Sequence, residues 1–483
     1  MSLTFLKDRA FLREMLTIAI PISFQQLVNA SLNMIDVIMV GQLGEAAIAA
    51  LGLANQVFFV FILLLFGTTS GMAIFTAQFW GKQEVGPIRK VLGMSILTTS
   101  VIALIFTLAA TLMPKTVLGL YTNDPEVIEL GSRYLRIVGF SYIPVAIATS
   151  YIATLRSIQL IKITVISTIS ALIFKTILGY MLIFGIGIFP ALGVAGAAIG
   201  TASGWILELI LLLALIYAQK TPLAANPLTF FSFKISFFGQ VFRTTFPALA
   251  NEFFWSVGIT TYNSIYAHIG TDAIAAINVN ATIEELGFVV FMGLGNACAV
   301  MVGNRIGAGN KEEAYEIVRR VVILCVFGAW VVELIVFLLR DLVVGLYDLS
   351  PSGVNNVRML ILMMASTLWI RMFNFSTFIG TLRAGGYALC PYHGNLFHLA
   401  DRCSRSLCWR FCVTSSCILC LSYGDARRNC QSLCLRVEVQ VAQVDSRPGK
   451  YIDLSVKMSA KWAKPVFPIT ARILEVKSEQ LFF

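Results

Sequence analysis

The sequence predicts an all-α polytopic membrane protein made of two parallel six-helix lobes, the second of which is truncated to four helices. Composition is the first reason, because 57% of the 483 residues are hydrophobic and only 13% are charged, whereas soluble domains carry about 25% charged residues. Length is the second, because about 20 apolar residues cross a hydrocarbon core of about 30 Å as a helix. Ten stretches meet this requirement: 15–40, 51–78, 91–113, 134–156, 162–184, 190–218, 243–268, 278–304, 318–340 and 357–383.

An internal repeat accounts for the two lobes. Six apolar stretches separate the copies, so both copies run in the same direction, and sites in such bundles lie between the halves. Four pairs of residues keep one constant spacing along the chain: Pro21 and Pro247, Gly44 and Gly270, Gly67 and Gly293, and Gly81 and Gly307. The predicted domains are a first lobe, a cytoplasmic linker, a truncated second lobe and a tail unrelated to the fold, at 1–218, 219–242, 243–386 and 387–483.

The tail is expected to be disordered or poorly packed, because the repeat stops near Gly386. A shift of reading frame at that point is its simplest interpretation. Eight of the ten cysteines lie between Cys390 and Cys434, and Cys417 and Cys420 have a spacing that metal sites use. No second such pair follows, so no metal site is predicted, and disulfides are not expected in a reducing cytosol.

Lysine and arginine set the expected orientation, because short cytoplasmic loops of membrane proteins are enriched in both. Basic residues precede the first span and occupy the loops after the second, fourth, sixth and eighth spans, whereas the intervening loops are short or acidic. We therefore expect a multi-pass protein of the inner membrane, surrounded by the lipid bilayer, with a cytoplasmic N-terminus. No cleavable signal peptide is predicted, because the first span is too long for one.

The first span carries an acid where an acid is expensive. A carboxylate at the centre of a membrane helix costs about 2.5–3.5 kcal/mol and usually faces a bundle interior or a wet cavity. Asp36 is therefore predicted to handle ions, with a structural interhelical hydrogen bond as the alternative. Lys175 in the fifth span must snorkel or pair, and we expect it to pair with Asp36 across the first lobe. The amides of Gln25, Asn29 and Asn33 are candidate ligands for a substrate or a cation.

The second lobe carries a different set of polar residues. Glu252 in the seventh span is a candidate counter-charge for a cationic substrate or a proton carrier, with a structural carboxylate bonded to Asn251 as the alternative. Tyr262 occupies the repeat position of the first-lobe acid, so the two lobes are not chemically symmetric. Arg371 in the tenth span is also a cation within an apolar segment, so it too must snorkel or pair, and Glu252 is its possible partner. Asn374, one turn later, completes the candidate binding residues.

Several classes of function are excluded by missing motifs. The glycine-rich segment 303–310 lacks the lysine of a phosphate-binding loop, and no H-E-x-x-H or similar catalytic constellation is present. We therefore expect neither an enzyme nor a cofactor, and any uphill transport must draw on a gradient of H⁺ or Na⁺. Of the formal net charge of +10, +6 lies in the tail from Ala384 onward, with 13 Lys and Arg against 7 Asp and Glu, and +4 in the remaining 383 residues, whose basic residues sit in loops on one face of the membrane. Nucleic acid is therefore not an expected partner.

At this point several segments can be read together: PISFQQLVNASLNMIDVIMVGQLG, TAQFWGK with its counterpart VGNRIGAGN, GYMLIFGIGIFPALGVAGAAIGT and TLRAGG. In combination they resemble the multidrug and toxic compound extrusion (MATE) transporters over residues 10–386. The resemblance implies twelve helices in two lobes, a central cleft, a monomer, and export of cationic or amphipathic small organic molecules in exchange for Na⁺ or H⁺. It also implies that Asp36 takes part in ion coupling and that Glu252 is similar to the family's seventh-helix carboxylate.

The sequence departs from this pattern in ways that favour proton coupling. Many relatives have amide or acidic residues in helix 5 where this chain has Lys175 and Gly179, and some sodium-coupled members have an aspartate in helix 10 where it has Arg371 and Asn374. The expected mechanism is rocking of the lobes, in which protonation of Asp36 from outside releases a cationic drug. Two alternatives stay open: a lipid-linked oligosaccharide flippase of related fold, and a nonfunctional frameshifted remnant.

Overall fold

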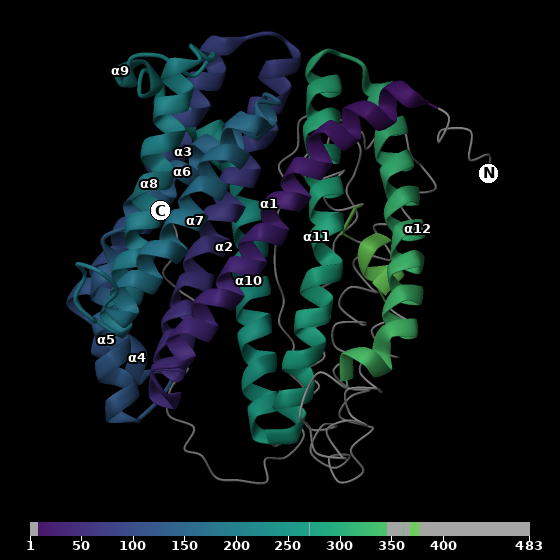
Figure 1. The fold of residues 1–483 in the computed structure, drawn as a ribbon. Coiled ribbons are helices and arrows are strands. Elements are labelled where there is room, and N and C mark those ends of the chain that lie inside the picture. The colour runs from purple at the N-terminus through teal and green to yellow at the C-terminus, as the bar shows by residue number, and fades with distance from the viewer. Residues whose placement is uncertain (1–7, 270, 345–360, 362–367, 374, 377–483) are drawn as a thin grey trace, which may run out of the picture. The chain divides into compact units, whose positions relative to one another are not determined.

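The computed structural model describes residues 8–269, 271–344, 361, 368–373 and 375–376. Every regular element in these ranges is a helix, as predicted (Figure 1). The helices are α1 (Arg9–Gly41), α2 (Glu45–Gly81), α3 (Val85–Leu112), α4 (Pro114–Gly119), α5 (Pro125–Gly139), α6 (Tyr142–Ser157), α7 (Ile161–Phe184), α8 (Val194–Ala218), α9 (Pro227–Phe230), α10 (Ile235–Ile269), α11 (Thr271–Gly307) and α12 (Lys311–Val344).

Most of the predicted spans coincide with long apolar helices. In the part of the chain that the structure describes, seven helices are long and apolar enough to cross a membrane, or eight if the bent pair α5 and α6 forms one span. The predicted span 243–268 lies within α10, which is not among these helices. Most of the last predicted span, 357–383, and the whole tail after it lie outside the described residues.

The predicted span 134–156 is not one straight helix. It is divided between α5 and α6, which meet at an angle of 52°. Polar groups satisfy the carbonyls at the break. Thr107 Oγ1 donates to the Gly139 carbonyl at 2.9 Å, and the Val138 carbonyl accepts from both the backbone N–H and the hydroxyl of Ser141, at 2.9 Å and 2.5 Å. Because these bonds keep the buried backbone satisfied, a bend is tolerated inside an apolar bundle.

The repeat appears in the structure with the spacing expected from the sequence. Helices α1, α2 and α3 begin at Arg9, Glu45 and Val85, and α10, α11 and α12 begin at Ile235, Thr271 and Lys311, with the offset of the glycine and proline pairs. The helices also match in detail, since α1 and α10 each contain an internal proline, Pro21 and Pro247. Three consecutive helices of one copy therefore have counterparts in the other.

The contacts between the copies follow the same spacing. A Cβ added to Gly81 at the end of α2 would strike the carbonyl oxygen of Asn304 on α11. A Cβ added to Gly307 at the end of α11 would strike the carbonyl oxygen of Gln78 on α2. Each residue of the first contact has its repeat counterpart in the second, so the two halves pack around a local pseudo-twofold axis. Glycine permits this approach because it has no side chain.

A second pair of contacts, further along the same helices, obeys the same symmetry. A Cβ added to Gly67 on α2 would lie 2.9 Å from Cα of Leu249 on α10. A Cβ added to Gly293 on α11 would strike the hydroxyl of Ser23 on α1, which donates to the Val289 carbonyl at 3.2 Å. The halves are therefore in direct backbone contact from these residues down to the ends of α2 and α11.

Helix α1 is shared by the two halves. Buried side chains of residues 11–22 pack into a core built with α11 and α12, and α1 also contacts α7 of the first half. Figure 1 shows α1 crossing obliquely from α12 and α11 toward α7. Two ion pairs fix its first turns to the second half, Asp8 to Arg320 at 2.8 Å and Glu14 to Arg305 at 3.0 Å.

Candidate functional site

The predicted pair of buried charges forms in the first half. Lys175 Nζ on α7 lies 2.7 Å from Asp36 Oδ2 on α1, which confirms the pairing expected from the sequence. The same ammonium donates to Asn33 Oδ1 at 3.2 Å. The lysine side chain is 7% exposed and the aspartate side chain 23% exposed, so the acid is the more accessible member of the pair.

Glycines on α8 make room for the lysine. A Cβ added to Gly204 would lie 2.6 Å from Cβ and 3.1 Å from Cγ of Lys175, so the stem of the lysine lies directly on the backbone of α8. One turn earlier, a Cβ added to Gly200 would lie 2.7 Å from Cα of Gly179. The Gly- and Ala-rich sequence of α8 thus brings the two helices close enough to bury an ammonium group between them.

The other polar residues of α1 are placed at different depths. Gln25 is buried, and its Oε1 accepts a hydrogen bond of 3.1 Å from Arg156 Nη2 on α6. Asn29 is half-buried and Asn33 exposed apart from its bond to the lysine. Gln25 therefore holds an arginine in this structure, and its role as a ligand for a substrate or cation stays a prediction.

A second acid of the first half was missed in the sequence. Glu208 lies on α8, where its Oε1 accepts a hydrogen bond of 2.6 Å from Thr168 Oγ1 on α7. The charges of Arg156 and Lys175 both act on this carboxylate. The rule that singled out Asp36, a carboxylate within an apolar span, applies equally to Glu208, which lies in the predicted span 190–218.

The candidate residues of the second half are only partly described. Asn251 is exposed and Glu252 half-buried on α10, where Glu252 approaches α2: a Cβ added to Gly67 would lie 3.2 Å from its Cγ. Arg371 is exposed, and its pairing with Glu252 stays a prediction. The side chain of Tyr262 and the whole of Asn374 lie outside the described residues.

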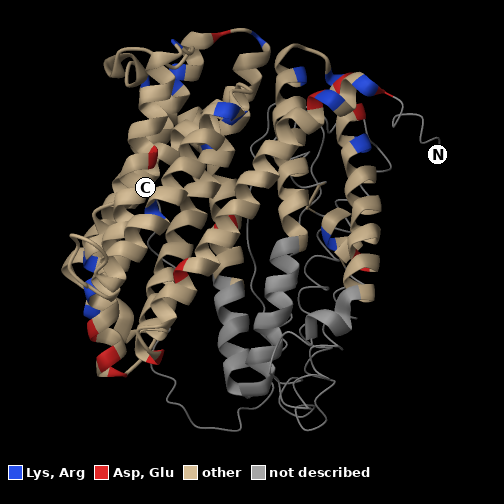
Figure 2. Cartoon of the chain, viewed as in Figure 1, with Lys and Arg blue, Asp and Glu red and all other residues tan. Residues whose placement is uncertain are grey.

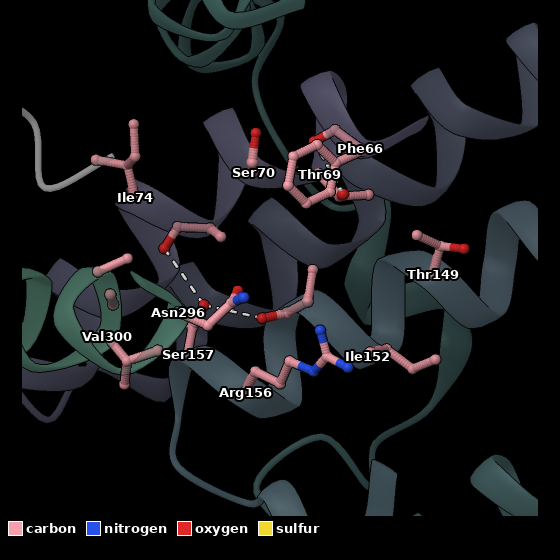
Figure 3. Close-up of a pocket in the computed structure, with 14 residues that line it drawn as sticks. Phe66, Thr69, Ser70, Ile74, Thr149, Ile152, Arg156, Ser157, Asn296 and Val300 are labelled. Atoms are coloured by element: carbon pink, nitrogen blue, oxygen red, sulfur yellow. Dashed lines mark hydrogen bonds between the residues drawn. The ribbon is translucent and has the colours of Figure 1, made fainter. Parts of the chain in front are cut away.

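A small cavity lies where the halves meet. It has a volume of about 100 Å³ and is lined by α2, α6 and α11. Arg156, Ser157 and Asn296 are among its lining residues (Figure 3). Ser157 Oγ donates to the carbonyl of Ala153 at 2.9 Å, whereas Arg156 Nε is buried without a partner. The one charged group of the lining is thus an arginine, and no acid lines the cavity.

No group of three or more His, Cys, Asp or Glu side chains within the described ranges is arranged to hold a metal ion. The cysteine-rich segment that we weighed as a metal site lies outside those ranges.

Two repeated helical units, several apolar spans and a charge pair between α1 and α7 define a polytopic membrane protein. Comparison with known proteins gives the family. The family model MatE matches residues 21–181 and 247–398, two segments that begin at the paired prolines of the repeat. The chain therefore belongs to the MatE family of multidrug efflux transporters. The second match ends at residue 398, a short way beyond Gly386, where we expected the pattern to break.

Relatives agree over most of the chain. A probable multidrug resistance protein NorM of Thermotoga maritima is 24% identical over 385 residues, which cover 78% of this chain and 81% of the relative. Multidrug resistance protein PmpM of Pseudomonas aeruginosa is 23% identical, with 79% of each chain covered.

Solved structures share the fold. The Vibrio cholerae MATE transporter VcmN superposes with a TM-score of 0.71 at 17% identity, over 78% of this chain and 85% of that one. A MATE family transporter of the MOP superfamily, described as outward-facing, superposes with a TM-score of 0.70 at 19% identity, over 77% and 82%.

Proposed function

We propose that the chain exports cationic or amphipathic organic molecules in exchange for protons, and that the pair of Asp36 and Lys175 couples the two movements. The observation that carries this proposal is the contact of 2.7 Å between their charged groups, on two different helices and with the acid partly exposed. Either charged side chain alone would be costly in an apolar bundle, and ionisable residues within a membrane usually mark an ion or proton pathway.

The ion pair favours H⁺ over Na⁺ as the coupling ion. An ammonium group already occupies the position beside the carboxylate that a sodium ion would take, so Na⁺ would have to displace Lys175 from Asp36. A proton needs no such space, because it binds to a carboxylate oxygen directly. Sodium coupling stays the alternative.

Protonation of Asp36 would weaken the binding of a cation nearby. It raises the charge of the site by one unit, and two unit charges about 7 Å apart interact by about 2 kcal/mol at an effective dielectric constant of about 20. This energy corresponds to an approximately 30-fold loss of affinity. A proton taken up from outside would thus expel the substrate to the outside, and release of the proton to the cytoplasm would reset the carboxylate.

We infer that this arrangement of the halves is the one closed to the cytoplasm, with the N-terminus on the cytoplasmic side. Lys and Arg lie mainly at the end where α1 begins, with a smaller mixed group of charges around α4 and α5 (Figure 2). In that mixed group Glu129 pairs with Lys115 at 2.9 Å and Arg133 at 3.4 Å. The direct contacts between the halves, at Gly81 and Gly307, lie at the end where α1 begins. We place that end in the cytoplasm of an inner-membrane protein acting as a monomer.

Efflux of a fluorescent cation from proteoliposomes tests the proposal. An imposed proton gradient should drive efflux without Na⁺ in the wild-type chain, and Asp36→Asn should reduce the rate at least about tenfold. Glu84→Gln, which changes an exposed carboxylate at the start of α3, serves as the control. Efflux by Asp36→Asn at the wild-type rate would refute the mechanism, and no efflux by the wild-type chain would favour the remnant alternative.

A further inference from the structure

Glu208 is a half-buried carboxylate within the apolar helix α8, and the proposed mechanism gives it no task. Its hydrogen-bond partner is the neutral hydroxyl of Thr168, and among the described residues no lysine or arginine nitrogen forms an ion pair with it, although Lys175 and Arg156 both act on it electrostatically. A buried carboxylate is stabilised far better by a direct cationic partner than by a hydroxyl. Its surroundings therefore suit a cation that reaches it in another state of the protein.

The geometry of α7 and α8 identifies that cation. The stem of Lys175 lies on Gly204 of α8. Glu208 follows Gly204 by four residues, so it lies on the same face of α8, about 6 Å further along the axis. Thr168, which holds Glu208, precedes Lys175 by two turns on α7. Glu208 and Thr168 therefore both lie beyond Lys175 toward the start of α7. Helical side chains point toward the start of their helix, so the side chain of Lys175 points toward these two residues.

Lys175 therefore lies between two carboxylates. Asp36 holds its ammonium now, and Glu208 lies one turn along α8 from Gly204, against which the flexible four-carbon stem of the lysine packs. We infer that these residues form a lysine switch, in which the ammonium of Lys175 moves to Glu208 when Asp36 takes up a proton and returns when Asp36 loses it. No bond other than the O–H of Asp36 is made or broken, and the proton comes from and returns to water. Glu208 is thus a positioning residue, and the switch rests on the proposed coupling role of Asp36.

The switch has a structural consequence. The pair of Asp36 and Lys175 ties α1 to α7, so moving the ammonium to α8 removes this ion pair and leaves the hydrogen bond between Gln25 and Arg156 as a side-chain link between α1 and the other helices of the first half. Two further charged or titratable groups among the described residues act on these acids: Arg156 on α6 places a positive charge near Glu208, and the phenol of Tyr134 on α5 interacts electrostatically with Asp36. Neither of these groups is a carboxylate, so the lysine has two acids to choose between.

Infrared difference spectroscopy of the full chain measures the switch without transport. The carboxylic acid band that Asp36→Asn removes reports the pH midpoint at which Asp36 becomes protonated. In Glu208→Gln the lysine has no second acceptor, so the midpoint should fall by about one pH unit or more. A plain field effect of Glu208 would also lower it, so the same change is made in a Lys175→Met background. The switch predicts that Glu208→Gln then has no effect on the midpoint, and a persisting shift would overturn it.

Thr168→Val provides a second test with the opposite sign and little risk to the fold. Removing the hydroxyl leaves Glu208 in greater need of the ammonium, so the lysine leaves Asp36 more readily and the midpoint of Asp36 should rise. Thr98→Val, which removes a hydroxyl bonded to the Met94 carbonyl elsewhere in the bundle, is the matched control. An unchanged or lowered midpoint in Thr168→Val overturns the switch. Wild-type efflux by Asp36→Asn would instead refute the proposed function, whatever the midpoints are.

Discussion

The ion pair between Asp36 and Lys175 should be worth more to the folded state than any surface pair of the chain. Lys175→Met keeps the apolar stem on α8 but leaves a partly buried carboxylate alone. Breaking a buried pair from one side costs about 3–5 kcal/mol, and since the Asp36 side chain is 23% exposed, we expect about 3 kcal/mol of unfolding free energy to be lost. Asp36→Asn should cost less, about 1.5 kcal/mol, because the ammonium keeps its bond to Asn33.

The double variant, with neither charge, should be no less stable than Asp36→Asn alone. A thermodynamic cycle from reversible unfolding in mixed detergent micelles should therefore give a coupling free energy of about 3 kcal/mol. The exposed pair of Lys115 and Glu129, 2.9 Å apart with side chains 62% and 47% exposed, is the matched control, with an expected coupling of about 0.2–1 kcal/mol. If the two cycles gave equal couplings, burial would not be what strengthens the first pair.

Two further predictions concern the contacts between the halves. Gly81→Ala and Gly307→Ala each press a methyl group against a backbone carbonyl of the other half, so both should lower the free energy of unfolding by about 1–3 kcal/mol and by similar amounts, whereas Gly52→Ala, in open space on α2, should not. The pKa of Asp8 is lowered from 3.8 by its hydrogen bond with Arg320, so its contribution to stability is present at neutral pH and is lost as the pH falls through the lowered pKa. The stability difference between the wild-type chain and Asp8→Asn, followed by thermal unfolding, should therefore shrink as the pH falls below 3.8.

The repeat could be predicted from the sequence because both copies need glycine or proline at the same positions of the backbone. A glycine or proline at one position of the first copy reappears at the matching position of the second, and the helices begin with the same offset. What each glycine touches was not readable. The contact of Gly81 with Asn304 depends on how the copies are rotated against each other, and a repeat spacing carries no information about that rotation.

The partner of a charged residue could be predicted where burying the charge alone would cost too much free energy. A lysine and an aspartate in neighbouring apolar spans leave few ways to satisfy both, and the expected pair is present. Neutral amides impose no such demand, which is why the bond of Gln25 to Arg156 was not foreseen. The bend between α5 and α6 depends on a hydroxyl of α3, Thr107, and so on packing across the sequence.

The two halves are alike in packing and unlike in charge, and this difference suggests how a proton could move helices. Helix α1 is held at its first turns by Arg320 and Arg305 of the second half and further along by Lys175 of the first half. The ion pairs with Arg320 and Arg305 join exposed or half-exposed groups, whereas the ion pair with Lys175 is the buried one and contains the acid that we expect to titrate. Releasing it frees one end of a helix whose other end stays anchored in the opposite half. A single protonation would then change how the halves are joined, which a charge confined to one half could not do.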